Sequence, residues 1–426
     1  MVTFLKKLKK TSSKLGPGII TGAAANDPSG IATYSQTGAQ FGYGQLWTAV
    51  FLLPLMIAVQ EASARIGAVK GKGIAAVVKE YFGRPALLLV VGLVLIANII
   101  NLGVDLGAMA AATNLLIPIP FAILTITFAV VILFLEIYTN YRSYARILKW
   151  LSLSLLAYPL TLFVVHQPWT QILKATFLPH IEFNLAFLFI ITGVVGTTIS
   201  PYMFFWQASE EIEEARKEHL ISEDGTVFMN HHFMKRLRLD NLIGMIASQI
   251  ATWSIIVTTA TILHGNGILD IKTAADAARA LEPLVSSFPN AGLIAKSIFA
   301  VGVIGLGLLA VPVLAGSAAY ALSEALGWNY GLNKKLKEAP GFYAIIIIAT
   351  LIGLGLNFLG IDPIKALVYT AVMNGIVCVP LLFIIAKIAG NKKIMGNYTS
   401  SIFSKIFIWL AFGVTLVAAI SLLLVR

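Results

Sequence analysis

The chain consists of apolar stretches of about 20 residues that are separated by short polar connections. A stretch of this length crosses the hydrocarbon core of a bilayer as a helix. The pattern therefore predicts an all-α, polytopic membrane protein with about eleven transmembrane helices in one domain. The predicted spans are 17–39, 45–68, 86–113, 119–139, 147–166, 183–208, 240–264, 291–325, 341–358, 361–389 and 402–425.

The composition excludes a soluble globular protein. Hydrophobic residues make up 58% of the 426 residues and charged residues only 12%, whereas a soluble domain carries roughly 25% charged residues. The single cysteine, Cys378, lies in an apolar stretch, so no disulfide can form within the chain. Residues 1–16 are basic and are not followed by the cleavage pattern of a signal peptide, so we expect a retained cytoplasmic tail.

Lysine and arginine are distributed unevenly between the predicted loops. If the N-terminus is inside, the outer side holds only Lys174, Lys272, Arg279, Lys296, Lys365 and the C-terminal Arg426. Cytoplasmic loops are enriched in these residue types, so we predict a plasma-membrane protein whose N-terminus is cytoplasmic and whose C-terminus is outside. The enrichment of lysine and arginine in the cytoplasmic loops then explains most of the net charge of +11. We therefore expect neither a nucleic-acid partner nor an obligatory protein partner.

Two connections are longer than the others. Residues 209–239 begin with a run of glutamates after the sixth span, and residues 265–290 contain a helix-like stretch on the opposite side. We expect both connections to form solvated or interfacial helices.

The first span is interrupted near its middle by Asn26-Asp27-Pro28-Ser29-Gly30. Proline removes a backbone donor and clashes with the preceding turn, and glycine adds backbone freedom. A carboxylate at this depth is costly unless it has a partner or water. A broken helix of this kind must line a cavity or be buried in protein. The simpler alternative is a proline kink in which Asp27 bonds to a neighbouring helix.

The sixth span is interrupted in a similar way by the Gly-Thr-Thr-Ile-Ser-Pro sequence of residues 196–201. A Ser-Pro pair alone could be an ordinary kink. The two breaks occupy matching positions, however, if residues 17–166 and 183–389 are two five-helix repeats that are followed by an extra helix at 402–426. Matching broken helices mark the midplane substrate site of secondary transporters. We therefore predict a 5+5 inverted repeat, although no internal sequence repeat is visible.

The groups at the helix break around Asp27 determine whether a positively or a negatively charged substrate can bind there. The first half-helix ends in carbonyl groups without helical partners, which carry partial negative charge, and Asp27 adds a full negative charge. Carbonyl, carboxylate and hydroxyl oxygens suit a hard cation, whereas Asp27 would repel an anion. The sequence therefore predicts a cation as the transported substrate.

Several motifs resemble those of the NRAMP family of divalent-metal transporters. Residues 27–30 (Asp-Pro-Ser-Gly) are similar to its Asp-Pro-Gly-Asn motif, and residues 40–43, 60–67 and 70–73 are similar to its second-helix region. Residues 197–202 stand in the place of its Ala-x-x-Met-Pro-His motif. The resemblance implies a LeuT-like fold with a metal site between helices one and six.

The resemblance also implies the ligands, and two of them differ from the family pattern. Asp27 and the carbonyls of Ala24 and Thr197 match, but Gly30 replaces an asparagine and Ser200 replaces a methionine. A thioether favours transition metals, so its loss removes that preference. Mg²⁺ dehydrates reluctantly and is held through waters with one or two carboxylates. The pattern resembles the NRAMP-related magnesium transporters and implies partly hydrated Mg²⁺, with Mn²⁺ as a second candidate, as the substrate. No resident cofactor is expected.

The proton route of the family is incomplete in this chain. Asp105 matches the aspartate of the helix-three motif, but the glutamate of that motif is missing. Tyr202 and Gln207 stand at the positions of two histidines, and neither residue titrates near neutral pH. We therefore expect import by alternating access that is driven by the membrane potential and is not coupled to protons.

Other polar residues are candidates for an outer layer around the cation or for its pathway. These candidates are Asn26, Thr198, Tyr202, Asp105, Asn101 and Asn374. Asn98, Asn101 and Asp105 share one face of helix three because of their spacing, and they either line the path or hold helices together. Glu61 is expected to pair with Arg65, one turn later.

Three other functions remain open at this point. They are a proton-coupled Mn²⁺/Fe²⁺ transporter, a sodium-coupled symporter of organic solutes on the same fold, and a metal sensor or scaffold that does not transport. The absence of a soluble effector domain argues against the last. The sequence has no phosphate-binding Gly-Lys-Ser/Thr loop and no second catalytic group near Asp27 by spacing, so we expect neither an ATP-driven pump nor an enzyme.

Overall fold

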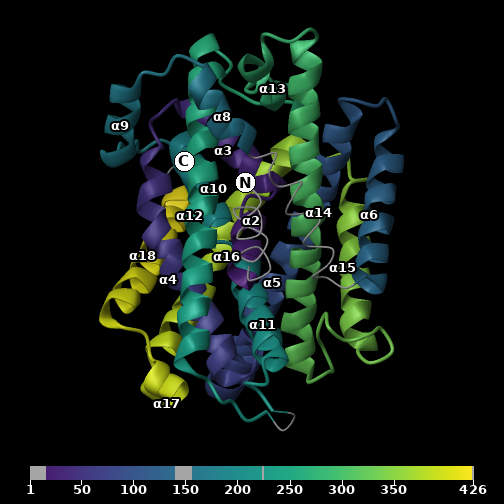
Figure 1. Ribbon diagram of the computed structural model, residues 1–426, viewed down its shortest axis with the longest axis vertical. Coiled ribbons are helices and arrows are strands. Elements are labelled where there is room, and N and C mark those ends of the chain that lie inside the picture. Colours follow the sequence, from purple (N-terminus) through teal and green to yellow (C-terminus); the bar gives the residue numbers. More distant parts are fainter. Residues whose placement is uncertain (1–15, 140–155, 223–224, 425–426) are drawn as a thin grey trace, which may run out of the picture.

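The computed structural model describes residues 16–139, 156–222 and 225–424, and these residues form an elongated bundle of helices (Figure 1). Short helices α9, α13 and α17 lie towards the ends of the bundle, with α13 and α17 at opposite ends (Figure 1). The helices are α2 (Pro17–Ala24), α3 (Pro28–Phe41), α4 (Trp47–Lys70), α5 (Ile74–Asn114), α6 (Phe121–Tyr138), α8 (Ala157–Val164), α9 (Trp169–Phe177), α10 (Leu185–Thr198), α11 (Pro201–Lys217), α12 (His231–Ile262), α13 (Ala274–Arg279), α14 (Ala291–Leu326), α15 (Pro340–Leu356), α16 (Pro363–Gly390), α17 (Lys392–Met395) and α18 (Ile402–Leu424).

The helical spans follow the predicted pattern. Among the described residues, 8 helices are long and apolar enough to cross a membrane, with α10 and α11 counted together. To these the structure adds the apolar α15 and the broken first span, α2 with α3. The predicted segment 147–166 lies partly outside the described residues, and α8 is its described part. The all-α architecture is confirmed, while the division into two five-helix repeats stays a prediction.

Burial separates the inner helices from those at the periphery. The most apolar windows of α14 and of α10–α11 are 78% buried, whereas those of α6 and α18 are only 28% and 22% buried. A helix that exposes so much apolar surface needs lipid around it, because water would disfavour that surface. The inner helices therefore form the walls of any internal site, and α6 and α18 face the bilayer.

The prediction of a solvated connection after the sixth span is wrong for its first part. Helix α11 continues to Lys217, and the side chains of Glu210, Glu211 and Glu213 are buried within the bundle. Glu213 accepts hydrogen bonds from the Tyr320 hydroxyl and from the Leu332 backbone N–H, the latter at 2.9 Å. Burial of the Glu213 carboxylate is tolerated because donors from distant segments satisfy it.

The connection 265–290 is also more buried than expected. It contains α13, as the sequence predicted, and the alanines of that helix pack into the core. The side chain of Gln36 on α3 holds the preceding segment, because its Oε1 accepts from the Ile271 N–H at 2.9 Å and its Nε2 donates to the Leu269 carbonyl at 3.2 Å. The connection is therefore fixed to α3, the second half of the first span.

Helix α2 lies directly against α12 without intervening side chains. A Cβ atom on Gly22 would stand 2.3 Å from the Gly244 carbonyl oxygen, which is too close for any other residue. Asp240 of α12 fastens the start of α2, because its carboxylate accepts from the backbone N–H groups of Gly16 at 3.0 Å and Gly18 at 2.7 Å. A carboxylate at a helix N-terminus satisfies free N–H groups and the positive end of the helix dipole.

We expect the Gly22→Ala substitution to destabilise the protein by about 1–3 kcal/mol, because the new methyl group must push α2 away from α12. The measurement is thermal unfolding of the purified protein in detergent. Gly92→Ala on α5 is the matched control, since a Cβ there meets no atom within 4 Å. An unchanged melting temperature for Gly22→Ala would show that the contact can relax.

Candidate metal site

The first break is organised around the Asp27 carboxylate. Helix α2 ends at Ala24 and α3 begins at Pro28, with Asp27 as the residue that caps α3. Asp27 Oδ1 accepts from the Gly30 backbone N–H and from the Ser29 hydroxyl, both at 2.7 Å. Proline at the first helical position needs no such acceptor, because it has no N–H. Asp27 therefore starts the second half-helix and keeps its other oxygen, Oδ2, for contacts outside it.

The second break uses a serine in a similar position. Helix α10 ends at Thr198, α11 begins at Pro201, and the backbone between them is not helical. The Ser200 hydroxyl donates back to the carbonyls of Gly196 at 2.8 Å and Thr197 at 3.0 Å. These bonds satisfy carbonyls at the end of α10 that the broken helix leaves without N–H partners.

Two tyrosines join the two breaks. The Tyr202 hydroxyl on α11 lies 2.9 Å from the Ala24 carbonyl oxygen and 3.2 Å from Asp27 Oδ2. The Tyr34 hydroxyl on α3 lies 3.2 Å from the Thr198 hydroxyl on α10. The two breaks therefore meet inside the bundle.

The two breaks pack closely around Gly30. A Cβ atom on Gly30 would stand 3.1 Å from the Thr197 hydroxyl oxygen, 3.2 Å from the Ala25 carbonyl oxygen and 3.4 Å from Asp27 Oδ1. The structure thus brings together the predicted set Asp27, Ala24, Gly30, Thr197 and Ser200. Their role as metal ligands stays a prediction.

A second buried carboxylate, Asp105 on α5, lies close enough to interact electrostatically with Asp27. No side chain among the described residues donates a hydrogen bond to its oxygens. The described ion pairs involve neither carboxylate. Two buried like charges are unfavourable unless a cation or a proton neutralises one of them. The pair therefore attracts positive charge to the point where the helices break.

The other predicted polar residues divide into two groups. The side-chain amides of Asn101 and Asn374 are buried without a described hydrogen-bond partner, so they are available to water or substrate. Asn26 instead points to α12, where its Nδ2 donates to the Ser248 hydroxyl at 3.0 Å. Asn98 bonds the Leu314 carbonyl at 3.1 Å and joins α5 to α14.

Three contacts of the site were not predicted. Ser29 and Tyr34 bond to members of the two breaks, and the Cys378 thiol of α16 donates to the Ile199 carbonyl at 2.5 Å. Ser29 follows the capping Asp27 by two residues, a spacing that allows a local side-chain hydrogen bond, so the sequence contained a signal for it. The contacts of Tyr34 and Cys378 depend on tertiary packing.

The pair predicted on α4 is present. The Arg65 guanidinium bonds the Glu61 carboxylate at 2.9 Å, one turn earlier. Arg65 also donates to the backbone of the connection before α18, at the Tyr398 carbonyl. The sequence also predicts that Glu136 pairs with Arg142 or Arg146, and both arginines lie outside the residues that the structure describes.

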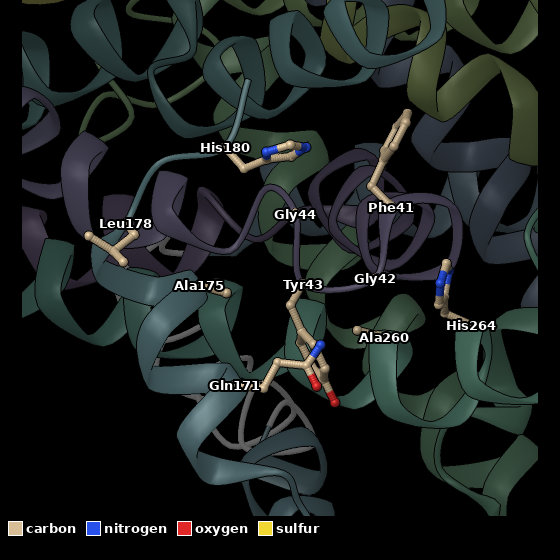
Figure 2. Close-up of a pocket in the computed structure, with 10 residues that line it drawn as sticks. All are labelled: Phe41, Gly42, Tyr43, Gly44, Gln171, Ala175, Leu178, His180, Ala260 and His264. Atoms are coloured by element: carbon tan, nitrogen blue, oxygen red, sulfur yellow. The ribbon is translucent and has the colours of Figure 1, made fainter. Parts of the chain in front are cut away.

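The site is closed in this structure, since Asp27, Thr197 and Ser200 are each 1% exposed. Towards α13, a cavity of only about 20 Å³ remains among apolar side chains, which include Pro28 and Ile31 of α3. A larger cavity of about 340 Å³ lies at the ends of α3 and α12, between His180 and His264 (Figure 2). It shares no lining residue with the predicted set, so it is a separate feature.

Comparison with known proteins then identifies the family. A family model described as "Natural resistance-associated macrophage protein-like" (Nramp) matches residues 18–425. The chain belongs to the NRAMP family. The predicted relationship is thereby confirmed, and NRAMP membership now rests on nearly the whole chain and not on short motifs alone.

Individual NRAMP relatives agree with this result. The chain is 27% identical over 409 residues to the divalent metal cation transporter MntH of Caldanaerobacter subterraneus, an alignment that covers 93% of this chain and 89% of that protein. It is 26% identical over 439 residues to MntH of Yersinia pestis, with 98% and 97% covered. Over nearly its whole length, the chain is thus similar to NRAMP proteins that are named divalent metal cation transporters.

Solved structures confirm the fold. The manganese transporter of Eremococcus coleocola, in complex with an aromatic bis-isothiourea substituted compound, superimposes with a TM-score of 0.72 at 15% identity, covering 96% of this chain and 85% of that one. MhsT in complex with L-phenylalanine gives a TM-score of 0.58 at 13% identity, with 96% and 98% covered. The NRAMP chain therefore has the LeuT-like architecture that the sequence predicted.

We expect Asp27→Ala to be less stable than Asp27→Asn by about 1 kcal/mol, because asparagine caps a helix as well as aspartate does and alanine does not. Both substitutions remove the buried charge, so their difference reports the helix cap together with the side-chain hydrogen bonds to Ser29 and Tyr202 that asparagine can retain. The measurement is again thermal unfolding in detergent. Equal stability of the two variants would contradict the role of Asp27 in starting α3.

Proposed function

We propose that this NRAMP transporter imports Mg²⁺ as a partly hydrated ion, with Mn²⁺ as a second substrate, by alternating access and without proton coupling. The proposed ligands are the Asp27 carboxylate, the Ala24 and Thr197 carbonyls and the Ser200 hydroxyl, with Gly30 beside them. The proposal includes a plasma-membrane location with the N-terminus inside and the C-terminus outside.

The observation that carries the proposal is the chemistry of the donors around Asp27. Its described neighbours are the hydroxyls of Ser29 and Tyr202, the Gly30 N–H and the carbonyl end of α2. The nearby Cys378 thiol donates to the Ile199 carbonyl. Oxygen ligands suit Mg²⁺ and Mn²⁺, whereas selection of softer ions requires sulfur.

Gly30 carries no side chain where the family places an asparagine, so no side-chain ligand at this position replaces a water of the ion. In the closed structure the Thr197 hydroxyl and Asp27 Oδ1 pack closely around this glycine, and we infer that the hydrated ion enters only when the two breaks separate. Mg²⁺ usually keeps several waters and binds through one or two carboxylates.

The contacts of Tyr202 and Gln207 support transport without protons. Gln207 accepts from the Thr21 hydroxyl and donates to the Glu211 carboxylate at 2.9 Å, and Tyr202 donates to Ala24 and Asp27. Both side chains are neutral hydrogen-bonding groups that do not change charge near neutral pH. Neither can therefore carry a proton across in step with a metal ion.

The membrane potential is sufficient to drive the proposed import. Moving one elementary charge through 100 mV is worth about 2.3 kcal/mol, so a divalent cation gains roughly 4.6 kcal/mol. The positive-inside distribution of lysine and arginine supports the orientation that the direction of transport requires.

One observation favours a second candidate, proton-coupled transport of Mn²⁺ or Fe²⁺. Asp105 is a buried carboxylate beside Asp27 to which no described side chain donates a hydrogen bond, and such a group could take up a proton when the metal leaves. A sodium-coupled symporter of organic solutes is no longer a competing function, because the family model covers the chain.

For selectivity, we expect the wild-type protein to bind Mg²⁺ without a strong preference for Cd²⁺. Ser200→Met should then increase the Cd²⁺ affinity about tenfold or more, because it restores a thioether at the break. The measurement is isothermal titration of Mg²⁺, Mn²⁺, Ca²⁺ and Cd²⁺. Asp27→Asn is the control without a cation site, since it keeps the helix cap and loses the charge. A wild-type site that strongly prefers Cd²⁺ would contradict the Mg²⁺ assignment.

For coupling, we expect proteoliposomes with an imposed inside-negative potential to take up Mg²⁺ without a change in luminal pH. A pH-sensitive dye in the lumen and Mg²⁺ uptake are followed in the same vesicles. Vesicles that contain the Asp27→Asn variant are the control, because they measure the Mg²⁺ that enters without using the proposed cation site. Luminal acidification in proportion to Mg²⁺ entry would favour the proton-coupled candidate and direct attention to Asp105.

A further inference from the structure

The Tyr202 hydroxyl contacts two of the oxygens that the proposed cation needs. It lies 2.9 Å from the Ala24 carbonyl oxygen and 3.2 Å from Asp27 Oδ2. A phenol hydroxyl has a single hydrogen to donate, so the two acceptors share it. In this arrangement Tyr202 stands between the end of α2 and the carboxylate.

The Ala24 carbonyl has no further capacity while Tyr202 is bonded to it. A carbonyl oxygen has two lone pairs, and the Asp27 backbone N–H, at 3.1 Å, uses the other. Asp27 Oδ1 is likewise occupied, by the Ser29 hydroxyl and the Gly30 N–H. A cation that binds the Ala24 carbonyl and Asp27 Oδ2 must therefore displace the hydrogen of Tyr202.

The position of this tyrosine is fixed by its surroundings. Tyr202 is the second residue of α11, directly after Pro201, and it is 1% exposed. Its backbone carbonyl accepts from the Ser317 hydroxyl of α14 at 2.9 Å. Because the backbone is held on one side and the ring is enclosed, the hydroxyl is kept at the two acceptors.

We propose that the Tyr202 hydroxyl is a built-in competitor of the transported cation and thereby sets its affinity. The inference rests on the proposed function. Before the cation binds, the hydroxyl stabilises the Ala24 carbonyl and Asp27; when the cation binds, both hydrogen bonds break. The free energy of these bonds is subtracted from that of cation binding. The affinity is lowered, and release on the far side is faster.

The test is Tyr202→Phe, which keeps the ring and removes only the hydroxyl. We expect the dissociation constant for Mg²⁺ and for Mn²⁺ to fall about tenfold, because hydrogen bonds to charged groups are strong and no longer compete. In proteoliposomes we expect the half-saturating Mg²⁺ concentration to fall and the maximal rate to fall with it, because release becomes slower. A role in structure alone would not tighten binding.

Tyr343→Phe is the matched control. Tyr343 of α15 is equally buried, at 2% exposed, and its hydroxyl donates to a backbone carbonyl, that of Lys334, at 2.7 Å. Its loss should change neither the affinity nor the rate. A second measurement uses the wild-type protein, in which saturating Mg²⁺ should change the tyrosine absorbance by breaking the Tyr202 hydrogen bonds. That difference should be absent from Tyr202→Phe.

Each other outcome overturns a specific proposal. Unchanged or weaker cation binding by Tyr202→Phe, or no tyrosine difference in the wild-type protein, overturns the competition and leaves Mg²⁺ transport intact. Binding of Mn²⁺ but not Mg²⁺ by the wild-type protein overturns the Mg²⁺ assignment. The proposed competition by Tyr202 is then tested by comparing the Mn²⁺ affinities of the wild-type protein and Tyr202→Phe. A wild-type protein that binds neither cation overturns both proposals.

Discussion

The central constraint on this structure is that a helix broken inside a bilayer must satisfy its free backbone groups without bulk water. The chain meets this constraint with side chains placed at the breaks themselves. Asp27 accepts the Gly30 N–H that begins α3, and Ser200 donates to the carbonyls that end α10. The groups that repair the backbone are the ones proposed to bind the cation, so the site exists because the helices are broken.

The same constraint explains how much could be predicted from the sequence. Apolar stretches of fixed length predict the helices, because every residue that faces lipid or core must be apolar. A proline beside an aspartate within such a stretch predicts the first break, and residues 196–201 predict the second. The local capping contact of Ser29 was also accessible, since it depends only on spacing within the motif.

What could not be predicted depends on residues that are distant in sequence. Glu213 was expected in solvent, but Tyr320 and the Leu332 N–H, more than 100 residues later, make its burial favourable. Asn26 sits next to Asp27 and yet bonds to α12. The directions of these side chains follow from helix packing, which the apolar pattern of a single sequence does not specify.

The contact between α2 and α12 has a mechanical consequence. It is made of backbone against backbone at Gly22 and Gly244, and it is held at one end by the Asp240 carboxylate. Large interlocked side chains would have to unpack, one by one, before two helices could part. Here the backbones of α2 and α12 meet at glycines, so the two helices could part at this point without unpacking large side chains, once the hydrogen bonds to Asp240 break.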